Sequence, residues 1–365
     1  MFSVTLHAVD GGNDRDYAPV DGDYLGTAKR VIGELEQAGV DAIIGLTHVH
    51  LWTDVEMANL KAEHPKLAFI VGGHEHEPQF HPGSATSAPV MKGASNARVI
   101  WRIDVDFDAH GLPVIEADVM EMGVGIEPDA DYASIEHKWR DRLLEKFPFL
   151  EARVGTASFP MDATEETVRN RETAWGNFLA DQMLGAFGEP AADFAFINSG
   201  SMRIDDYVVD DITFEDIART FGFSSFLRYV SMTGDEFRQM MEAGFRGDGS
   251  SQGYFPQIAG FRVCVDRSRE EGSRIVSLQV MREDKWQAAD GDATYMVVMP
   301  DFLYRGGDGY QVPEGRKGSR TGAELKYLVL DAILAAQAQG RTVGVPVDPE
   351  SRRIHLLDAP GAQCF

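Results

Sequence analysis

Cysteine is nearly absent from this 365-residue chain, which contains only Cys264 and Cys364. Two cysteines supply neither a framework of several disulfides nor a thiolate metal site, and both are expected to be inert thiols. Cysteine usage therefore leaves the cellular compartment open.

Positive charge is scarce too, because 58 acidic residues face 34 lysines and arginines and give a net charge of −24. This balance argues against a nucleic-acid polymer or an anionic membrane surface as partner, since both need clustered cations. No run reaches the roughly 18 apolar residues of a membrane span, and no basic stretch followed by an apolar run opens the chain. An anionic ligand would have to be bound by a few placed arginines or by a metal.

What the sequence does contain fits a globular protein, with 44% hydrophobic residues, 37 glycines and 16 prolines. Its length leaves room for two domains. Phe2, Val4 and Leu6 alternate with polar residues from the first positions, so we expect the chain to begin inside a strand. A domain that opens mid-strand indicates missing upstream sequence and an unpaired sheet edge near residues 1 to 7, through which the chain could associate.

Hydrophobic periodicity predicts an alternating first half and an irregular second half. The first half is expected to contain helices at 24–38 and 54–64, strands at 40–48 and 66–76, and a hairpin of strands at 98–107 and 112–121. A charged helix at 127–147 follows as a connector. The second half is expected to contain helices at 172–187, 214–220 and 322–338, a strand at 193–198, and several strands between 261 and 299. Alternating strands and helices favour α/β, and the irregular order favours α+β.

Three histidines follow the ends of two predicted strands: His48 in "THVHLWTD", and His74 and His76 in "GGHEHEP". Neutral imidazole is a good ligand for Zn, Mn, Fe, Co or Ni, and strand ends converge at one edge of a sheet. The pattern predicts a metal site. His50 and His64 are interpreted as structural.

These stretches, with "PVMKGASNARVIWRIDVDFD" after them, resemble the calcineurin-like metallophosphoesterases, and among them the family of 5′-nucleotidases, UDP-sugar hydrolases and 2′,3′-cyclic-nucleotide phosphodiesterases. The resemblance implies that His48, His74 and His76 belong to a two-ion centre of Zn, Mn, Co or Mg. The family's earlier Asp-x-His, Gly-Asp and Gly-Asn-His motifs do not precede residue 48, and "DAH" at 108–110 is interpreted as a turn. We therefore expect no catalytic residue in this chain and at most one bound ion.

The second half resembles the 5′-nucleotidase C-terminal domain in "RNRETAWGNFLADQML", "FAFINSGSMR" and "MPDFLYRGGDGYQ". An arginine that closes a Gly/Ser loop can present a bidentate fork to phosphate, and aromatic rings grip any nucleobase by stacking. The resemblance implies phosphate-binding arginines, two base-stacking rings, a carboxylate for the ribose hydroxyls and an amide near the sugar. The corresponding residues are Arg169, Arg203, Phe223, Phe302, Asp308 and Asn198.

The expected architecture is a partial metallophosphoesterase αββα sandwich at 1–125, a linker helix at 126–150, and a mixed α+β 5′-nucleotidase C-terminal domain at 151–365. The expected function is metal-dependent hydrolysis of nucleoside 5′-phosphates or related phosphoesters, with little activity in this chain alone. Two alternatives stay open: a module that binds nucleotides or nucleosides, and one half of a split enzyme. By resemblance the compartment is periplasmic or extracellular.

Overall fold

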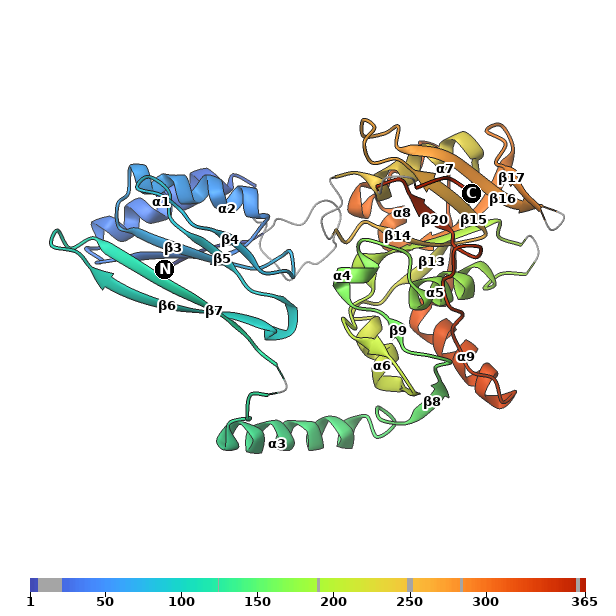
Figure 1. The fold of residues 1–365 in the computed structure, drawn as a ribbon, viewed down its shortest axis with the longest axis horizontal. Helices are drawn as coiled ribbons and strands as arrows, with labels where there is room; N and C mark the ends of the chain where they lie inside the picture. Colours follow the sequence, from blue (N-terminus) through green and yellow to red (C-terminus); the bar gives the residue numbers. More distant parts are fainter. Residues whose placement is uncertain (6–21, 124, 189–190, 248–251, 283–284, 359–361) are drawn as a thin grey trace. The chain divides into compact units, whose positions relative to one another are not determined.

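The computed structural model describes residues 1–5, 22–123, 125–188, 191–247, 252–282, 285–358 and 362–365 (Figure 1). The chain divides into two compact units, Met1–Ala133 and Ser134–Phe365. The division falls inside helix α3 (Ala130–Lys146), within the segment expected to be a linker helix at 126–150. The expected strand at the start of the chain is present as β1 (Phe2–Thr5), while residues 6 and 7 lie outside the described part.

The first unit is built on a five-stranded sheet in the order β1-β2-β3-β5-β4. Its strands are β1, β2 (Ile43–His48), β3 (Leu67–Gly72), β4 (Gln79–His81) and β5 (Val90–Lys92). Strands β1, β2, β3 and β5 run parallel, and β4 pairs antiparallel with β5. Within the described residues β1 pairs with β2 alone and forms an edge of the sheet.

Two helices, α1 (Tyr24–Gln37) and α2 (Leu51–Ala58), cover one face of this sheet, and the short 3-10 helix Asn59–Ala62 extends α2 (Figure 1). Their apolar residues form a buried cluster with those of the sheet, including Ile32, Ile43 and Met57. The hairpin β6 (Val99–Phe107) and β7 (Pro113–Glu121) covers the other face, where Trp101 and Ile115 pack on Phe69. The unit thus has three layers: helices, a mostly parallel sheet and a hairpin.

The second unit contains a five-stranded sheet in the order β14-β10-β18-β13-β19. These strands are β10 (Phe194–Asn198), β13 (Phe226–Thr233), β14 (Pro256–Ala259), β18 (Thr294–Pro300) and β19 (Ser319–Glu324). The order combines parallel and antiparallel pairs, as expected for an α+β domain. Together with the first unit it confirms the mixed α/β and α+β class.

This sheet separates two hydrophobic cores, because successive side chains of a strand point to opposite faces. On β10, Ala195 and Ile197 enter one core, while Phe194 and Phe196 enter the other. The first core is closed by helices α5 (Ala174–Leu184), α6 (Phe214–Thr220) and α9 (Leu325–Ala338). The second is closed by helix α7 (Gly234–Met241) and the sheet of β15 (Phe261–Val265), β16 (Ile275–Arg282), β17 (Lys285–Ala288) and β20 (Ile354–Leu356).

Smaller elements join these layers. They are α4 (Glu165–Val168), α8 (Asp301–Tyr304), the strands β8 (Arg153–Thr156), β9 (Met161–Asp162), β11 (Tyr207–Val208) and β12 (Asp211–Thr213), and four 3-10 helices at Ser95–Ala97, Ser199–Ser201, Glu242–Phe245 and Gly307–Gly309. Nowhere in the described ranges is a helix long and apolar enough to cross a membrane.

Helix α3 buries none of its side chains, as expected for a charged connector. Its Arg140 nevertheless binds two carboxylates of the second unit, because its guanidinium donates to both oxygens of Glu215 at 2.8 and 2.6 Å and to Glu151 at 2.5 Å. A bidentate arginine pair of this kind fixes orientation as well as distance. The later turns of α3 are therefore attached to the start of α6.

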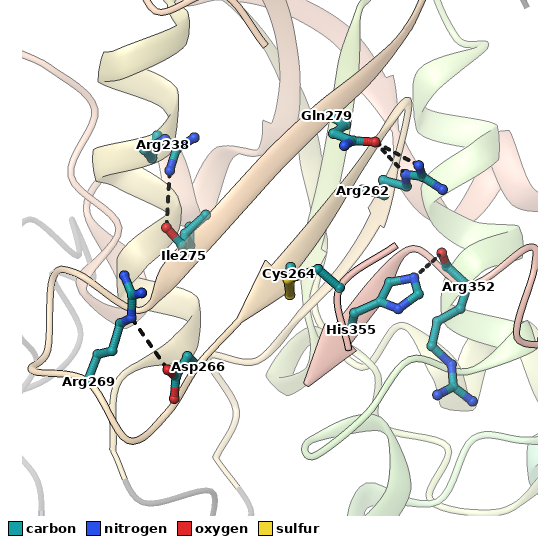
Figure 2. The surroundings of a disulfide bond; sticks show 10 residues. Arg238, Arg262, Cys264, Asp266, Arg269, Ile275, Gln279, Arg352 and His355 are labelled. Atoms are coloured by element: carbon teal, nitrogen blue, oxygen red, sulfur yellow. Dashed lines mark hydrogen bonds and ion pairs between the residues drawn. A yellow bond between two sulfur atoms is a disulfide. The ribbon is translucent and has the colours of Figure 1, made fainter. Parts of the chain in front are cut away.

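The expectation of two inert thiols is wrong: Cys264 and Cys364 form a disulfide with their Cα atoms 5.5 Å apart. Cys264 lies on β15, and β20 runs parallel beside it with Cys264 opposite His355. Figure 2 shows Cys264 on β15 beside His355 of β20. The Phe365 ring lies 4.1 Å from the Arg262 guanidinium, which also belongs to β15. The two cysteines are 100 residues apart in the sequence, and this spacing does not predict a bond between them. They come together because β20, near the end of the chain, pairs with β15.

Candidate functional site

The predicted substrate residues come to one edge of the second unit's sheet because of strand direction. Strands β10 and β18 run parallel, so Asn198 at the end of β10 and Phe302 just after β18 leave the sheet on the same side. Strand β13 is antiparallel to β18 with Leu227 opposite Pro300, which places its starting end, just after Phe223, at this edge. Carboxyl edges of parallel strands are common ligand sites.

A hydrogen-bonded pair forms the polar centre of this edge. Asn198 Nδ2 donates to Asp308 Oδ2 at 2.7 Å, and the Ser201 hydroxyl donates to Asn198 Oδ1 at 2.6 Å. Asp308 has a left-handed backbone, with φ of 51°. Burial raises the pKa of its carboxyl above the ordinary value, while the Asn198 hydrogen bond and nearby arginines act in the opposite direction. The predicted sugar ligands Asn198 and Asp308 are thus direct partners.

The two predicted phosphate-binding arginines share one carboxylate. Arg169 Nη2 lies 2.9 Å from Glu165 Oε1, and Arg203 Nη1 lies 3.5 Å from the same oxygen. Glu165 and Arg169 are both 6% exposed. Both arginines also act electrostatically on Asp308. In a chain with a net charge of −24, this edge holds a local concentration of guanidinium groups.

The two predicted stacking rings are exposed, with Phe223 at 62% and Phe302 at 41%. Large apolar side chains are usually buried, so two exposed rings beside polar residues point to a ligand surface. The Arg203 guanidinium lies 5.3 Å from the centre of the Phe223 ring. Phe302 lies against the backbone of Gly307, where a Cβ atom would stand 2.5 Å from the ring. Glycine is required at Gly307 to leave room for that ring.

Sequence reasoning missed Arg246, which supports this edge from a different segment. Its Nη1 donates to the carbonyl oxygen of Asp308 at 2.5 Å, and its guanidinium stacks 4.0 Å from the Tyr254 ring. The antiparallel pair β10–β14 sets Asn198 opposite Pro256 and so brings this segment to the site edge. No motif marks an arginine that acts on a backbone carbonyl 62 residues later.

In the first unit, the histidines also follow the carboxyl ends of parallel strands. His48 ends β2, and His74 and His76 lie in the loop after β3. The rings of His48 and His74 are 5.4 Å apart, and His50, interpreted from sequence as structural, lies 4.3 Å from His74 and stacks on Trp52. His64 lies apart and binds Glu36 at 2.8 Å. His74 and His76 both have left-handed backbones, with φ of 97° and 68°.

Burial lowers the pKa of His74 to about 4, and the neighbouring His50 adds to the effect. Burial also lowers the pKa values of His48 and His50. These imidazoles are therefore neutral at pH 7, which is the form that binds metals.

Lys92, a second residue that sequence reasoning missed, lies beneath the histidine loops at 1% exposure. Its ammonium group contacts the carboxylates of Asp54 at 2.9 Å and Glu75 at 2.6 Å. It also donates to the carbonyl oxygens of Val49 at 2.6 Å and Gly73 at 3.0 Å. Lys92 thus ties together the loops that follow β2 and β3.

Glu75 has a further role, because its other oxygen accepts a hydrogen bond from the backbone N–H of Leu51 at 2.7 Å and so caps helix α2. Its side chain is committed to Lys92 and this cap.

The histidines offer suitable donor atoms for a divalent metal, but they do not make a complete site. Among the residues with described placement, no three His, Cys, Asp or Glu side chains are arranged to hold one ion. The nearest carboxylates, Asp54 and Glu75, are engaged with Lys92. The three predicted ligands His48, His74 and His76 therefore stay a prediction.

Comparison with known proteins agrees with this geometry. Residues 153–315 match the model of the 5′-nucleotidase C-terminal domain. The chain is 28% identical over 325 residues to the trifunctional nucleotide phosphoesterase protein YfkN of Bacillus subtilis, covering 86% of this chain and 22% of that protein. It is 25% identical over 320 residues to human 5′-nucleotidase, covering 77% of this chain and 54% of the human protein. Residues 153–315 thus resemble the 5′-nucleotidase C-terminal domain, and the chain as a whole is similar to 5′-nucleotidases.

A solved family structure shows the same fold. The 5′-nucleotidase precursor from Thermus thermophilus superposes with a TM-score of 0.80 at 23% identity, covering 94% of this chain and 69% of that one. The similarity covers 94% of the chain and so includes residues of both units. Relative to its curated relatives this chain is short: it spans about a fifth of the Bacillus protein and about half of the human one.

Proposed function

We propose that the second unit binds a nucleoside 5′-phosphate or a related nucleotide phosphoester, and that the chain takes part in hydrolysing it. The observation that carries the proposal is the meeting of guanidinium groups, one carboxylate and two exposed rings at a single sheet edge. Arg169 and Arg203 would bind the phosphate, because guanidinium groups match its oxygens bidentately. Phe223 and Phe302 would stack on the base.

The ribose would bind at Asp308, whose carboxylate accepts hydrogen bonds from vicinal hydroxyls, with Asn198 holding the carboxylate in place at 2.7 Å. Stacking grips every base through its π-face, so this arrangement supports broad base acceptance.

We further propose that His48, His74 and His76 contribute to a divalent-metal site for Zn, Mn, Co or Mg. A bound ion would act as a Lewis acid and lower the pKa of a bound water. Three imidazoles hold at most one ion, while two-ion centres also need bridging carboxylate or hydroxide ligands. Phosphate release by this chain alone is therefore expected to be slow, and full phosphatase activity of residues 1–365 would contradict this expectation.

Binding is tested by calorimetry with AMP and adenosine in EDTA, which separates binding from hydrolysis. Arg203→Met is expected to weaken AMP at least tenfold and adenosine by less than threefold, because a hydrogen bond to a charged group contributes about 1.5–3 kcal/mol. Phe223→Ala is expected to weaken both ligands, since both carry the base. Arg171→Met, an exposed neighbour, is the matched control. We call Arg169, Asn198, Arg203, Phe223, Phe302 and Asp308 the clamp. Unchanged affinities in the first two variants would refute the clamp.

Hydrolysis is tested by phosphate release from AMP with Mn²⁺ or Zn²⁺, before and after chelation. The metal proposal is supported if EDTA abolishes phosphate release and His74→Asn reduces it. A rate indifferent to EDTA would refute it.

A second candidate is a module that binds nucleotides without hydrolysing them. It is favoured by the contrast between the assembled clamp and the histidine loops, where the described side chains bring no three metal-binding groups together. AMP binding without metal-stimulated phosphate release, in this chain and in one extended upstream, would decide for the module.

The disulfide supports a proposed location in an oxidising compartment, periplasmic or extracellular, because structural disulfides are rare where glutathione keeps thiols reduced. Alkylation of intact cells followed by mass spectrometry is expected to find Cys264 and Cys364 unmodified and bonded. Two alkylated cysteines in the mature protein would contradict this location.

A further inference from the structure

Glu165 is a buried carboxylate placed beside two arginines that the proposed function assigns to phosphate. It begins α4 and is 6% exposed. An acidic group is unfavourable next to an anionic ligand, because like charges repel most strongly where water is excluded. Its presence there calls for a role that outweighs this repulsion.

Glu165 joins two segments that are far apart in sequence. Arg169 follows one helical turn later, with its Nη2 at 2.9 Å from Glu165 Oε1, and Arg203 comes from the loop after β10, with its Nη1 at 3.5 Å from the same oxygen. Two guanidinium groups would otherwise repel each other, and their long side chains have many rotamers. A shared carboxylate compensates the repulsion and restricts both side chains.

The backbone that carries this carboxylate is itself held in place. The backbone N–H of Glu165 donates to Asp205 Oδ1 at 2.9 Å, and Asp205 is 3% exposed with a left-handed backbone. Asp205 lies two residues after Arg203, so the loop that carries Arg203 is bound to α4 at two points. The position of Arg203 relative to Arg169 is therefore fixed through Glu165.

We propose that Glu165 is a positioning residue that orients Arg169 and Arg203 so that their other N–H groups face the phosphate. It does not contact the ligand. The inference rests on the proposed function, since it concerns the phosphate end of the same clamp. The proposal requires that orienting the two arginines strengthens phosphate binding by more than the repulsion between Glu165 and phosphate weakens it. The change in AMP affinity when Glu165 is replaced measures which effect is larger.

The test is calorimetry with AMP and adenosine in EDTA on wild type, Glu165→Gln and Glu166→Gln. Glu166 is the exposed neighbour on α4 and is the matched control. Glu165→Gln is expected to weaken AMP binding about tenfold and to change adenosine binding less than twofold, because adenosine has no phosphate. A purely structural role would weaken both ligands equally. Tighter AMP binding by Glu165→Gln would show that repulsion dominates and would overturn the proposal.

A double variant shows whether Glu165 acts through Arg203. In an Arg203→Met background, Glu165→Gln is expected to reduce AMP affinity by much less than in wild type, since one of the two arginines that it orients is gone. Fully additive losses would overturn the proposal.

If Glu165→Gln fails to fold, Glu165→Asp replaces it. This variant keeps the charge but withdraws it by one methylene, and it is expected to weaken AMP selectively; unchanged or tighter AMP binding overturns the proposal. Wild type that binds neither AMP nor adenosine would refute the proposed function itself. Wild type that binds both normally, with Glu165→Gln unchanged, would refute the positioning role alone.

Discussion

Replacing Cys364 with serine should destabilise the second unit and leave the first unit unchanged. The disulfide closes a loop of 100 residues, from β15 to the segment after β20. For a loop of this length the chain-entropy model gives about 4.7 kcal/mol at 25 °C, acting on the unfolded state. Cys364 is the better site for substitution, because Cys264 is fully buried and its loss would also leave a cavity.

The folded state should survive this change. Strand β20 still pairs with β15, with Val263 opposite Ile354 and Val265 opposite Leu356. Calorimetry on the two-unit chain is expected to resolve separate transitions. A loss of about 4.7 kcal/mol corresponds to a decrease of roughly 9–19 °C for a unit of this size, at about 2–4 °C per kcal/mol.

The first unit, which has no cysteine, serves as the internal control. Reduced wild type should match Cys364→Ser. Two results would refute the reasoning: a shift of the second transition below about 2 °C, or detection of two free thiols in the unreduced, denatured protein.

Three further predictions concern single side chains. The His74 pKa is about 4 in the folded state and near 6.5 when unfolded, so the unfolded state binds more protons between these pH values. The unfolding free energy should therefore be at its full value above pH 6.5 and decrease toward pH 4. In His74→Asn, measured in EDTA, this decrease should be smaller. Identical pH profiles would contradict the assignment. Lys92→Met should lower the unfolding free energy of the first unit by about 3–5 kcal/mol, because Asp54 and Glu75 lose their buried counter-ion; urea titration showing a loss below about 1 kcal/mol would argue against it. Asp308→Asn should weaken adenosine about tenfold or more while sparing 2′,3′-dideoxyadenosine, and equal effects on both nucleosides in calorimetry would exclude a ribose contact.

Residues proposed to bind a ligand were easier to find in the sequence than those that support them. Asn198, Arg203 and Asp308 lie in short motifs, and the structure brings Asn198 and Asp308 within hydrogen-bonding distance. Some boundaries agreed closely: α1 ends at Gln37 where a helix to 38 was expected, and β6 and β7 match the predicted hairpin within a residue. Others were wrong, because β3 ends at Gly72 where a strand to 76 was expected, and α2 begins at Leu51 where a helix from 54 was expected. Periodicity over ten or more residues is a strong local signal.

Supporting residues were missed because their partners are distant in sequence. Lys92 is the last residue of a short strand and resembles an ordinary surface lysine in the sequence, but the pairing of β5 with β3 brings it to the carbonyl oxygen of Gly73. Arg246 contacts a carbonyl 62 residues away, and Cys264 finds its partner only through β20. Each of these depends on strand order, which hydrophobic patterning does not encode.

The place of β10 in its sheet also sets when the clamp can exist during synthesis. Asn198 and Asp308 are 110 residues apart. Strand β10 cannot pair with β18 until Thr294–Pro300 has been made, and the clamp is complete only when Asp308 has followed. At about 5–20 residues per second, this interval is roughly 5–20 s. Through that time Phe194 and Phe196 have no sheet partner on the β18 side, so the nascent chain presents them to chaperones or to other chains. A nucleotide bound at the proposed site would therefore stabilise the completed unit, but it would not act as a template for its earlier folding.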